Sequence, residues 1–188
     1  SRGLETRAEH MFLTASTSEA YSFLFKVLCD PGDEVLIPSP SYPLFDYLAR
    51  LEGVNVKPYP LGFDGVYYYD ASEVELRVSP RTKAVVVVSP NNPTGTYIRA
   101  RELDRLLDLG IPVISDEVFD GYALERPHDA VSATSAKRSL TFSLFGLSKQ
   151  AALPQMKLAW TCAAGAPPLV AEAMTRLDVV GDTFLSTS

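Results

Sequence analysis

The run Ala-Val-Val-Val-Val at residues 84–88 constrains the fold of this chain more than any other stretch. It contains no polar residue, so a strand formed here has no face that suits water. Strands covered on both faces are typical of parallel sheets that carry helices on each side. We therefore expect residues 84–88 to form a central strand of such a sheet.

The segments around this strand alternate between helix-like and strand-like patterns. Apolar residues spaced three and four apart predict helices over residues 20–28, 42–52, 71–78, 103–109 and 170–177. Short apolar runs predict further strands over residues 35–37, 54–56, 111–115, 140–144 and 158–162. Residues 62–69 are expected to form a turn-rich connection, and Val74 and Val78 are expected to face the core. Helices alternating with strands imply an α/β fold, a three-layer sandwich with a mostly parallel central sheet flanked by helices.

Composition and charge exclude several classes of protein. The chain carries 17 Lys and Arg against 23 Asp and Glu, a net charge of −6, which argues against nucleic acid and membrane surfaces as partners. With 46% hydrophobic residues in 188, it suits one globular domain, without the long apolar run of a membrane span. Cys29 and Cys162 are too few for a disulfide framework, so we expect a reducing, cytoplasmic compartment. Only two histidines are present, and no metal site is expected.

Polar segments follow three of the predicted strands. The strand ending at Val88 leads into Asn92-Pro93-Thr94-Gly95, the strand ending at Ser115 into Asp116, and the strand ending at Leu144 into Ser148-Lys149. Each alone has an ordinary reading, as a turn, a satisfied carboxylate or a surface lysine. In parallel sheets, however, ligands bind beyond the carboxyl ends of the strands. We therefore expect the three segments to meet in one site.

Lys149 has the surroundings of a nucleophile. Its neighbours in the chain include Phe145, Leu147 and Leu153, so its stem lies in an apolar segment. Desolvation frees an amine to attack carbonyl compounds and form a Schiff base. Other chemistries lack their motifs: the chain has no GxxxxGK[ST] and no GxGxxG, and Gln150 breaks a serine-hydrolase elbow around Ser148.

Taken together, these segments resemble the class I/II aminotransferases of pyridoxal-phosphate fold type I. The resemblance rests on order and spacing, because Asp116 follows Asn92 by 24 residues and Lys149 follows Asp116 by 33. It runs from about Thr14 to Cys162. It implies that residues 1–188 form the cofactor-binding large domain of such a protein, with pyridoxal 5′-phosphate as the cofactor.

The resemblance also implies a role for each matching residue. Lys149 would form the Schiff base with the cofactor and move the proton at the substrate α-carbon. Asp116 would face the pyridine nitrogen and keep it protonated, which favours electron withdrawal by the ring. Asn92 would donate to the phenolic oxygen of the ring. Tyr42 would stack on the ring face; its alternative is a core residue at a helix start.

The phosphate would lie at the N-terminus of the helix that begins near Ser18, where free N–H groups favour an anion. Ser16 and Thr17 would donate to it there, although the same residues also suit an ordinary helix cap. Ser148 and Lys157 would complete the phosphate contacts.

Four positions depart from the pattern of the family. Lys157 stands where arginine is usual, and it lacks the bidentate fork of that residue. Ser16 stands where glycine is common, and Gly146 stands where a second serine is common. Phe119 replaces a tyrosine that usually donates to the phenolic oxygen of the cofactor. We expect these changes to preserve cofactor binding and to lower the efficiency of the reaction.

The resulting hypothesis is an aminotransferase that moves an amino group between an amino acid and a 2-oxo acid and acts as a homodimer. A C–S lyase or synthase on the same scaffold would use the same residues, and a non-catalytic cofactor-binding fragment is a third alternative. The chain starts at Ser1 without an initiator methionine, so we expect a fragment, incomplete at both ends and without the small C-terminal domain. The resemblance places the arginine for the substrate carboxylate in that domain, so we expect the isolated residues to turn over poorly.

Overall fold

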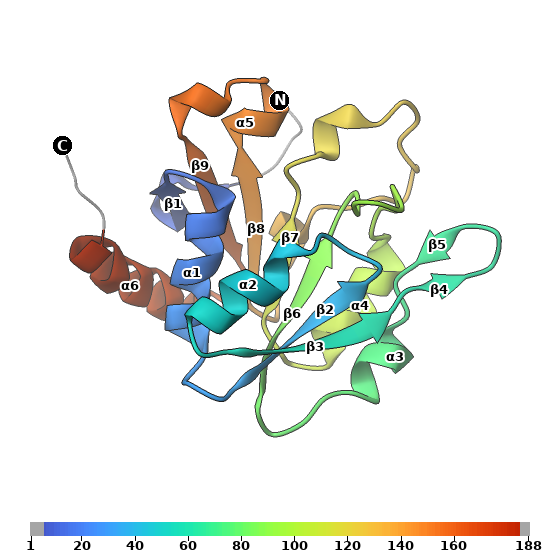
Figure 1. The fold of residues 1–188 in the computed structure, drawn as a ribbon, viewed down its shortest axis with the longest axis horizontal. Helices are drawn as coiled ribbons and strands as arrows, with labels where there is room; N and C mark the ends of the chain where they lie inside the picture. Colours follow the sequence, from blue (N-terminus) through green and yellow to red (C-terminus); the bar gives the residue numbers. More distant parts are fainter. Residues whose placement is uncertain (1–5, 185–188) are drawn as a thin grey trace.

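A seven-stranded sheet forms the centre of the molecule in the computed structural model, which describes residues 6–184 (Figure 1). Its strand order is β1-β9-β8-β7-β6-β2-β3. The strands are β1 (Met11–Thr14), β2 (Glu34–Ser39), β3 (Asn55–Pro60), β6 (Thr82–Val88), β7 (Val113–Asp116), β8 (Thr141–Gly146) and β9 (Ala159–Ala164). The neighbours from β3 to β8 run parallel, whereas β9 runs antiparallel to both β8 and β1. The expected mostly parallel sheet is confirmed.

Strand β6 lies inside the sheet, between β7 and β2, and is buried on both faces, as its valine run predicts. Successive side chains of a strand point to opposite faces. Val86 and Val88 accordingly belong to one hydrophobic cluster, and Val85 and Val87 belong to the other. Two separate cores on the two faces of one sheet make the molecule a three-layer sandwich.

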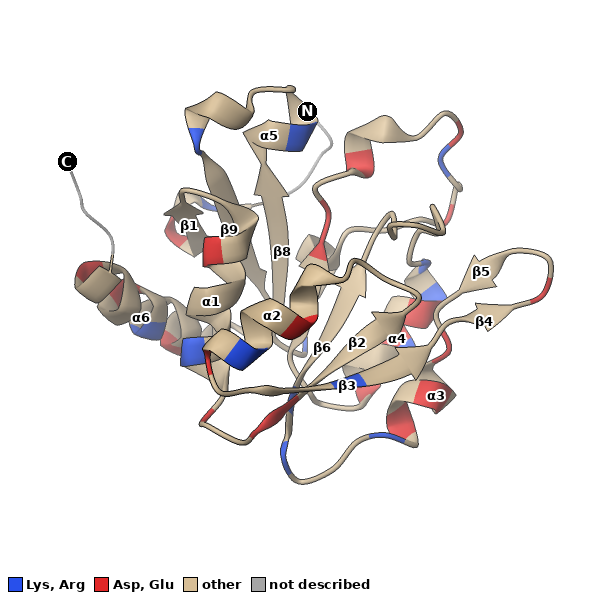
Figure 2. Ribbon diagram, in the orientation of Figure 1, with Lys and Arg blue, Asp and Glu red and all other residues tan. Residues whose placement is uncertain are grey.

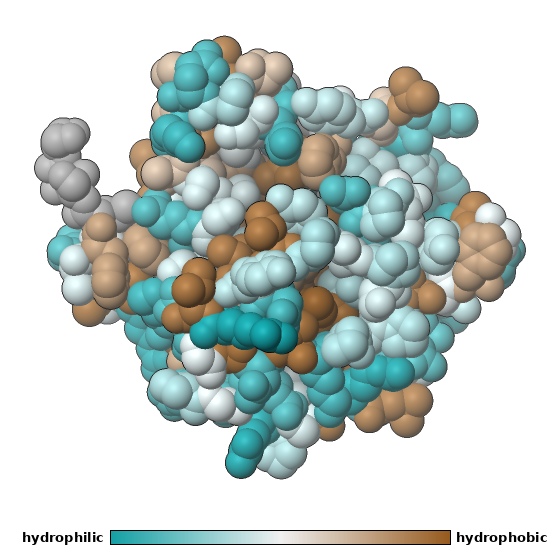
Figure 3. Space-filling view, viewed as in Figure 1, coloured by the Kyte–Doolittle hydropathy of each residue, from teal (hydrophilic) through white to brown (hydrophobic). Residues whose placement is uncertain are grey.

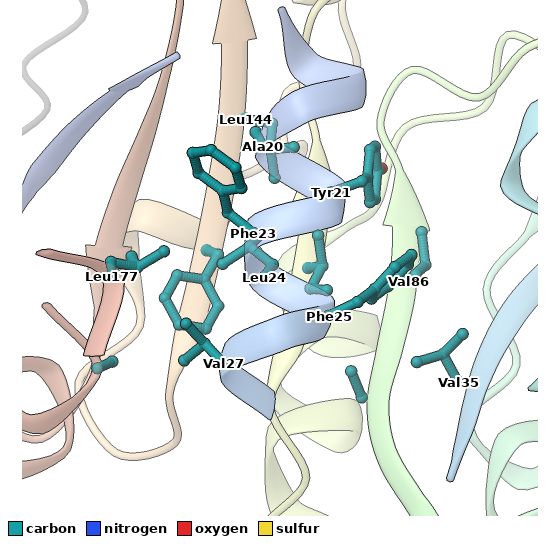
Figure 4. Close-up of a cluster of buried hydrophobic side chains, with 14 of the residues drawn as sticks. Ala20, Tyr21, Phe23, Leu24, Phe25, Val27, Val35, Val86, Leu144 and Leu177 are labelled. Carbon is teal, nitrogen blue, oxygen red and sulfur yellow. The ribbon is translucent and has the colours of Figure 1, made fainter. Parts of the chain in front are cut away.

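Three helices cover one face of the sheet: α1 (Thr17–Leu28), α2 (Leu44–Leu51) and α6 (Pro167–Phe184). Helix α1 contributes most to this core, with six buried hydrophobic side chains. Figure 4 shows them between β6, β8 and α6, where Leu24 lies near the middle and Leu144 and Val86 belong to the sheet. Full burial of one such side chain stabilises the fold by about 1.5–3 kcal/mol.

The other face is covered by α3 (Ala71–Glu75) and α4 (Ala100–Asp108), together with a 3-10 turn at Ala133–Ser135. Leu103, Leu106 and Leu107 of α4 face the sheet, as their spacing predicts. Short helical segments complete the fold: a 3-10 turn at Ala8–His10, another at Asp120–Tyr122, α5 (Leu147–Gln150) and a last one at Pro154–Met156.

Three details differ from the expectations. Strand β1 lies at the edge of the sheet and is not among the predicted strands, although Met11, Phe12 and Leu13 form a short apolar run; Met11 and Leu13 remain exposed. Residues 62–69 form a hairpin of β4 (Gly62–Phe63) and β5 (Tyr67–Tyr68) instead of an irregular connection. A Cβ at Gly62 would overlap the Tyr68 ring, so a larger residue there would displace that ring. Helix α3 ends early, and Val78 lies 38% exposed while Val74 is buried.

Charged residues of both signs are interspersed over the ribbon in Figure 2. None of the helices in residues 6–184 combines the length and the apolar composition needed to cross a bilayer. The first five and last four residues lie outside the described part of the chain, and with them both ends of the domain expected over residues 1–188.

Candidate active site

A cavity of about 290 Å³ opens where β6, β7 and β8 end. Parallel strands end at the same edge of a sheet, which is why segments far apart in the sequence meet here. Eight of the nine predicted site residues line this cavity: Ser16, Thr17, Tyr42, Asn92, Asp116, Phe119, Ser148 and Lys149. Lys157 is the exception. It is exposed, has a left-handed backbone with φ of 48°, and is not part of the lining.

The N-terminus of α1 forms one wall of the cavity. The Ser16 hydroxyl caps this helix, because it accepts a hydrogen bond from Glu19 N at 3.1 Å. The Glu19 carboxylate in turn accepts from Ala15 N at 2.7 Å. Helix geometry leaves the N–H groups of Thr17 and Ser18 without an acceptor inside the helix, and both residues line the cavity. This end of the cavity therefore suits an anion.

Asp116 lies at the end of β7 with both carboxylate oxygens engaged. Its Oδ1 accepts from Val118 N at 3.2 Å, and its Oδ2 accepts from the Tyr21 hydroxyl at 3.3 Å. Burial raises the pKa of this carboxyl from 3.8 to about 6, and the neighbouring Glu117 adds to the rise. The two hydrogen bonds oppose the rise because they favour the charged form. A half-buried carboxylate of this kind favours a cation beside it.

Lys149 lies on α5 across the cavity mouth. Its Nζ is 5.6 Å from the centre of the Phe119 ring, a cation–π contact. The Tyr122 hydroxyl donates to the Lys149 carbonyl at 2.7 Å, and the rings of Phe119 and Tyr122 meet edge to face at 5.8 Å. The loop after Asp116 therefore holds the helix that carries Lys149.

Asn92 and Tyr42 line the cavity from two adjoining loops. Asn92 is exposed, whereas its neighbour Asn91 is buried and joins the loops by donating from Nδ2 to Pro40 O at 3.0 Å. The Asn91 Oδ1 accepts from the Ser41 hydroxyl at 3.2 Å. Tyr42 is 44% exposed, and its ring meets Phe45 edge to face at 6.2 Å. Asn91 thus sets the distance between the two loops that present Asn92 and Tyr42.

Gly146 lies beside the anion-binding end, between β8 and α5. A Cβ placed there would be 3.5 Å from the Ala159 side chain and 3.7 Å from that of Thr17, which is ordinary van der Waals contact. Its φ of −165° is extended backbone that any residue adopts. The position has room for the serine that is common there in the resembled family.

Sequence reasoning missed Tyr21, Asn91 and Glu117. Tyr21 follows Thr17 by four residues, so the two lie on the same face of α1. This spacing could have predicted that Tyr21 lies beside the site. The sequence singles out Asn92, which precedes Pro93, and carries no signal that the neighbouring Asn91 is the buried one. Glu117 is buried, and its carboxylate accepts from Ala133 N at 3.0 Å, so it fixes the turn at Ala133–Ser135. Burial raises the pKa of Glu117.

Comparison with known proteins adds three findings. Residues 1–188 match the family described as aminotransferase class I and II. The alanine aminotransferase of Mycobacterium tuberculosis is 30% identical over 161 residues, which are 84% of this chain and 38% of that protein. The aspartate/prephenate aminotransferase of Thermus thermophilus is 31% identical over 190 residues, 98% of this chain and 48% of that protein.

The likeness extends to solved structures. The alanine aminotransferase from Pyrococcus furiosus superposes with a TM-score of 0.87 at 28% identity, over 97% of this chain and 47% of that one. An aspartate aminotransferase from Thermus thermophilus superposes with a TM-score of 0.80 at 28% identity, over 98% and 47%. The chain thus spans less than half the length of these relatives.

Proposed function

The chain belongs to the aminotransferase class I and II family, and from that premise we propose that it moves an amino group between an amino acid and a 2-oxo acid with pyridoxal 5′-phosphate. The observation that carries the proposal is the single cavity in which Lys149, Asp116 and Asn92 meet the N-terminus of α1. An amine, a half-buried carboxylate, an amide and an anion-binding helix end are the groups that this cofactor needs.

The donor set fits the cofactor at each end. Thr17, Ser18 and Ser148 surround the anion-binding end and would hold its phosphate, with the hydroxyl proton of the capping Ser16 as a further donor. At the other end, the raised pKa of Asp116 reflects a half-buried carboxylate that a protonated ring nitrogen would stabilise. When bound, pyridoxal phosphate supplies a carbonyl for the amine and a ring that withdraws electrons.

The remaining roles fall to side chains around the middle of the cavity. The Lys149 amine is the nucleophile, and its Nζ takes the proton from the substrate α-carbon and returns it. Asn92 donates to the phenolic oxygen, and the Tyr42 ring covers the cofactor face. Phe119 contacts the Lys149 Nζ and would pack at the edge of the cofactor ring, where a tyrosine would add a hydroxyl. Lys157 adds positive charge for the phosphate.

We assign residues 1–188 to the large, cofactor-binding domain. The lengths of the matches support this assignment: they include 84–98% of this chain but only 38–48% of the two relatives compared above. We also place the protein in the cytoplasm, in keeping with two free cysteines, of which Cys162 is buried and Cys29 half-buried.

The full-length protein is proposed to act as a homodimer. The family resemblance suggests it, and apolar side chains gather around α2 on the face shown in Figure 3. Leu44, Tyr47 and Leu51 of this helix are 38%, 64% and 82% exposed. Light scattering after size exclusion tests the assignment, because a monomer of the full-length protein contradicts it.

A single-turnover experiment tests the activity. The full-length protein, loaded with pyridoxal phosphate, is mixed with alanine, tyrosine or aspartate, and the cofactor and products are separated by chromatography. Amino transfer yields pyridoxamine phosphate and 2-oxo acid in equal amounts. Release of ammonia and 2-oxo acid from a β-substituted amino acid, with the cofactor unchanged, would instead establish a lyase. Binding without either reaction would establish a non-catalytic domain.

A further inference from the structure

Tyr21 connects the helix at the anion-binding end with the carboxylate at the opposite end of the cavity. It lies on α1 and is 2% exposed, and its hydroxyl donates to Asp116 Oδ2 at 3.3 Å. Among the described residues, 6–184, this is the one hydrogen bond that the Tyr21 hydroxyl makes. A buried hydroxyl without a partner is costly, so the fold holds Asp116 Oδ2 within its reach.

The Tyr21 ring is held firmly from two sides. It meets Phe45 of α2 edge to face at 5.1 Å and lies tilted against Phe25 at 5.9 Å. Its hydroxyl is therefore a fixed point, whereas the Asp116 side chain can turn about its own bonds. Since Val118 N holds Oδ1 and Tyr21 holds Oδ2, both oxygens have a set direction.

Helix geometry places this contact beside the cavity. Thr17 and Tyr21 are four residues apart, so they lie one turn apart on the same face of α1. Thr17 lines the cavity at the anion-binding end, and the Tyr21 hydroxyl donates to Asp116. A shift of α1 would move both ends of the site together.

We propose that Tyr21 is a positioning residue, which orients the Asp116 carboxylate and ties it to the helix that faces the phosphate. The contact itself does not depend on the cofactor. Its consequence for cofactor binding rests on the function proposed above.

Several groups set the charge of Asp116. Tyr21 faces it from α1, Glu117 follows it in the chain, and Lys149 lines the same cavity from α5. The charge of Asp116 also helps to raise the pKa of Tyr69, which lies just before α3. The Tyr21 hydrogen bond favours the charged carboxylate, while Glu117 and burial favour the acid. Removal of the hydroxyl alone should therefore raise the pKa of Asp116.

The variant Tyr21→Phe tests this with Tyr59→Phe as its matched control. Tyr59 is also fully buried, but its hydroxyl donates to Val86 O at 2.7 Å and it belongs to the core on the other face of the sheet. The Asp116 carboxyl is titrated by ¹³C NMR in the cofactor-free chain. We expect its pKa to rise by about half a unit to one unit in Tyr21→Phe and to stay unchanged in Tyr59→Phe. An unchanged pKa in Tyr21→Phe, or an equal rise in both variants, overturns the proposal.

A measurement on the unaltered chain decides the same question without a variant. The ¹³Cζ signal of Tyr21 should shift with the midpoint of the Asp116 titration, because the charge of its acceptor changes there. The ¹³Cζ signal of Tyr59 should not follow. A Tyr21 signal that stays constant through this midpoint contradicts the hydrogen bond.

Measuring the affinity for pyridoxal phosphate distinguishes failure of the positioning role of Tyr21 from failure of the proposed function. At pH 6, pyridoxal phosphate should bind Tyr21→Phe about two- to fivefold more weakly than the unaltered chain, because less of Asp116 is ionised, and the difference should vanish at pH 8. Failure of the unaltered chain to bind refutes the proposed function, while the NMR titration still decides on Tyr21. Equal binding at pH 6 counts against the positioning role.

Discussion

Asp116 is the residue at which stability and function conflict most. Its folded-state pKa of about 6 lies above the 3.8 of an unperturbed carboxyl, so the folded chain binds this proton more tightly than the unfolded chain. Stability from this group is therefore present below about pH 4 and is lost as the pH rises through about 6. At neutral pH the cofactor-free chain carries a half-buried charge on Asp116 that destabilises it.

The variant Asp116→Asn removes that charge and keeps the size of the side chain. We expect its free energy of unfolding at pH 7 to exceed that of the unaltered chain by about 2 kcal/mol, measured by urea denaturation without cofactor. The gain should shrink toward pH 4. The same variant should bind pyridoxal phosphate more weakly, since the ring nitrogen loses its partner. A less stable Asp116→Asn at pH 7 would show that the carboxylate is already compensated in the fold.

Gly146 offers a gain of function at the scale of one residue. The space beside Thr17 and Ala159 admits a Cβ without a clash, so Gly146→Ser should fold normally. Its hydroxyl would add a donor at the anion-binding end and tighten pyridoxal phosphate binding by roughly tenfold. Gly146→Ala is the control, because it adds the same carbon without the donor. Equal affinity of the two variants, measured by fluorescence titration, would argue against a phosphate at this end.

Helix α1 contributes side chains to both the hydrophobic core and the candidate site. Leu24 is fully buried at the centre of its inner face, so Leu24→Ala should reduce the free energy of unfolding by about 2–5 kcal/mol. Leu51→Ala is the matched control, because Leu51 on α2 is 82% exposed and its loss should change stability by less than about 0.5 kcal/mol. Urea denaturation measures both. Equal effects would mean that α1 is not packed as described.

The elements that could be predicted are those with a strong burial pattern. The valine run of β6 is buried on both faces and the leucines of α4 on one, so local composition identifies them directly. Strand β1 was not predicted although residues 11–13 are apolar; Met11 and Leu13 remain exposed at the sheet edge, so burial in the core does not account for this run. In the β4–β5 hairpin the Tyr68 ring packs over Gly62, a contact that appears only once the chain is folded.

The central sheet brings together the segments that form the candidate site, although they lie far apart in the sequence. The residues at strand ends, Asn92, Asp116 and Lys149, could be predicted because parallel strands bring their carboxyl ends together. Asn91 could not be predicted, since the sequence does not show which of two neighbouring asparagines points inward. The four-residue spacing from Thr17 places Tyr21 on the cavity side of α1 but does not identify Asp116 as its partner. The predicted phosphate role of Lys157 stays a prediction, because its exposed side chain is not part of the cavity lining.

The central claim is that Lys149 forms the covalent bond with pyridoxal phosphate, and borohydride reduction followed by tryptic peptide mapping tests it most directly. A reduced lysine resists trypsin, so modification of Lys149 should place the phosphopyridoxyl group on the uncut peptide of residues 139–157. Lys149→Ala should take up no label. A label on the peptide of residues 150–176, which would place it on Lys157, or on any other lysine, would contradict the account.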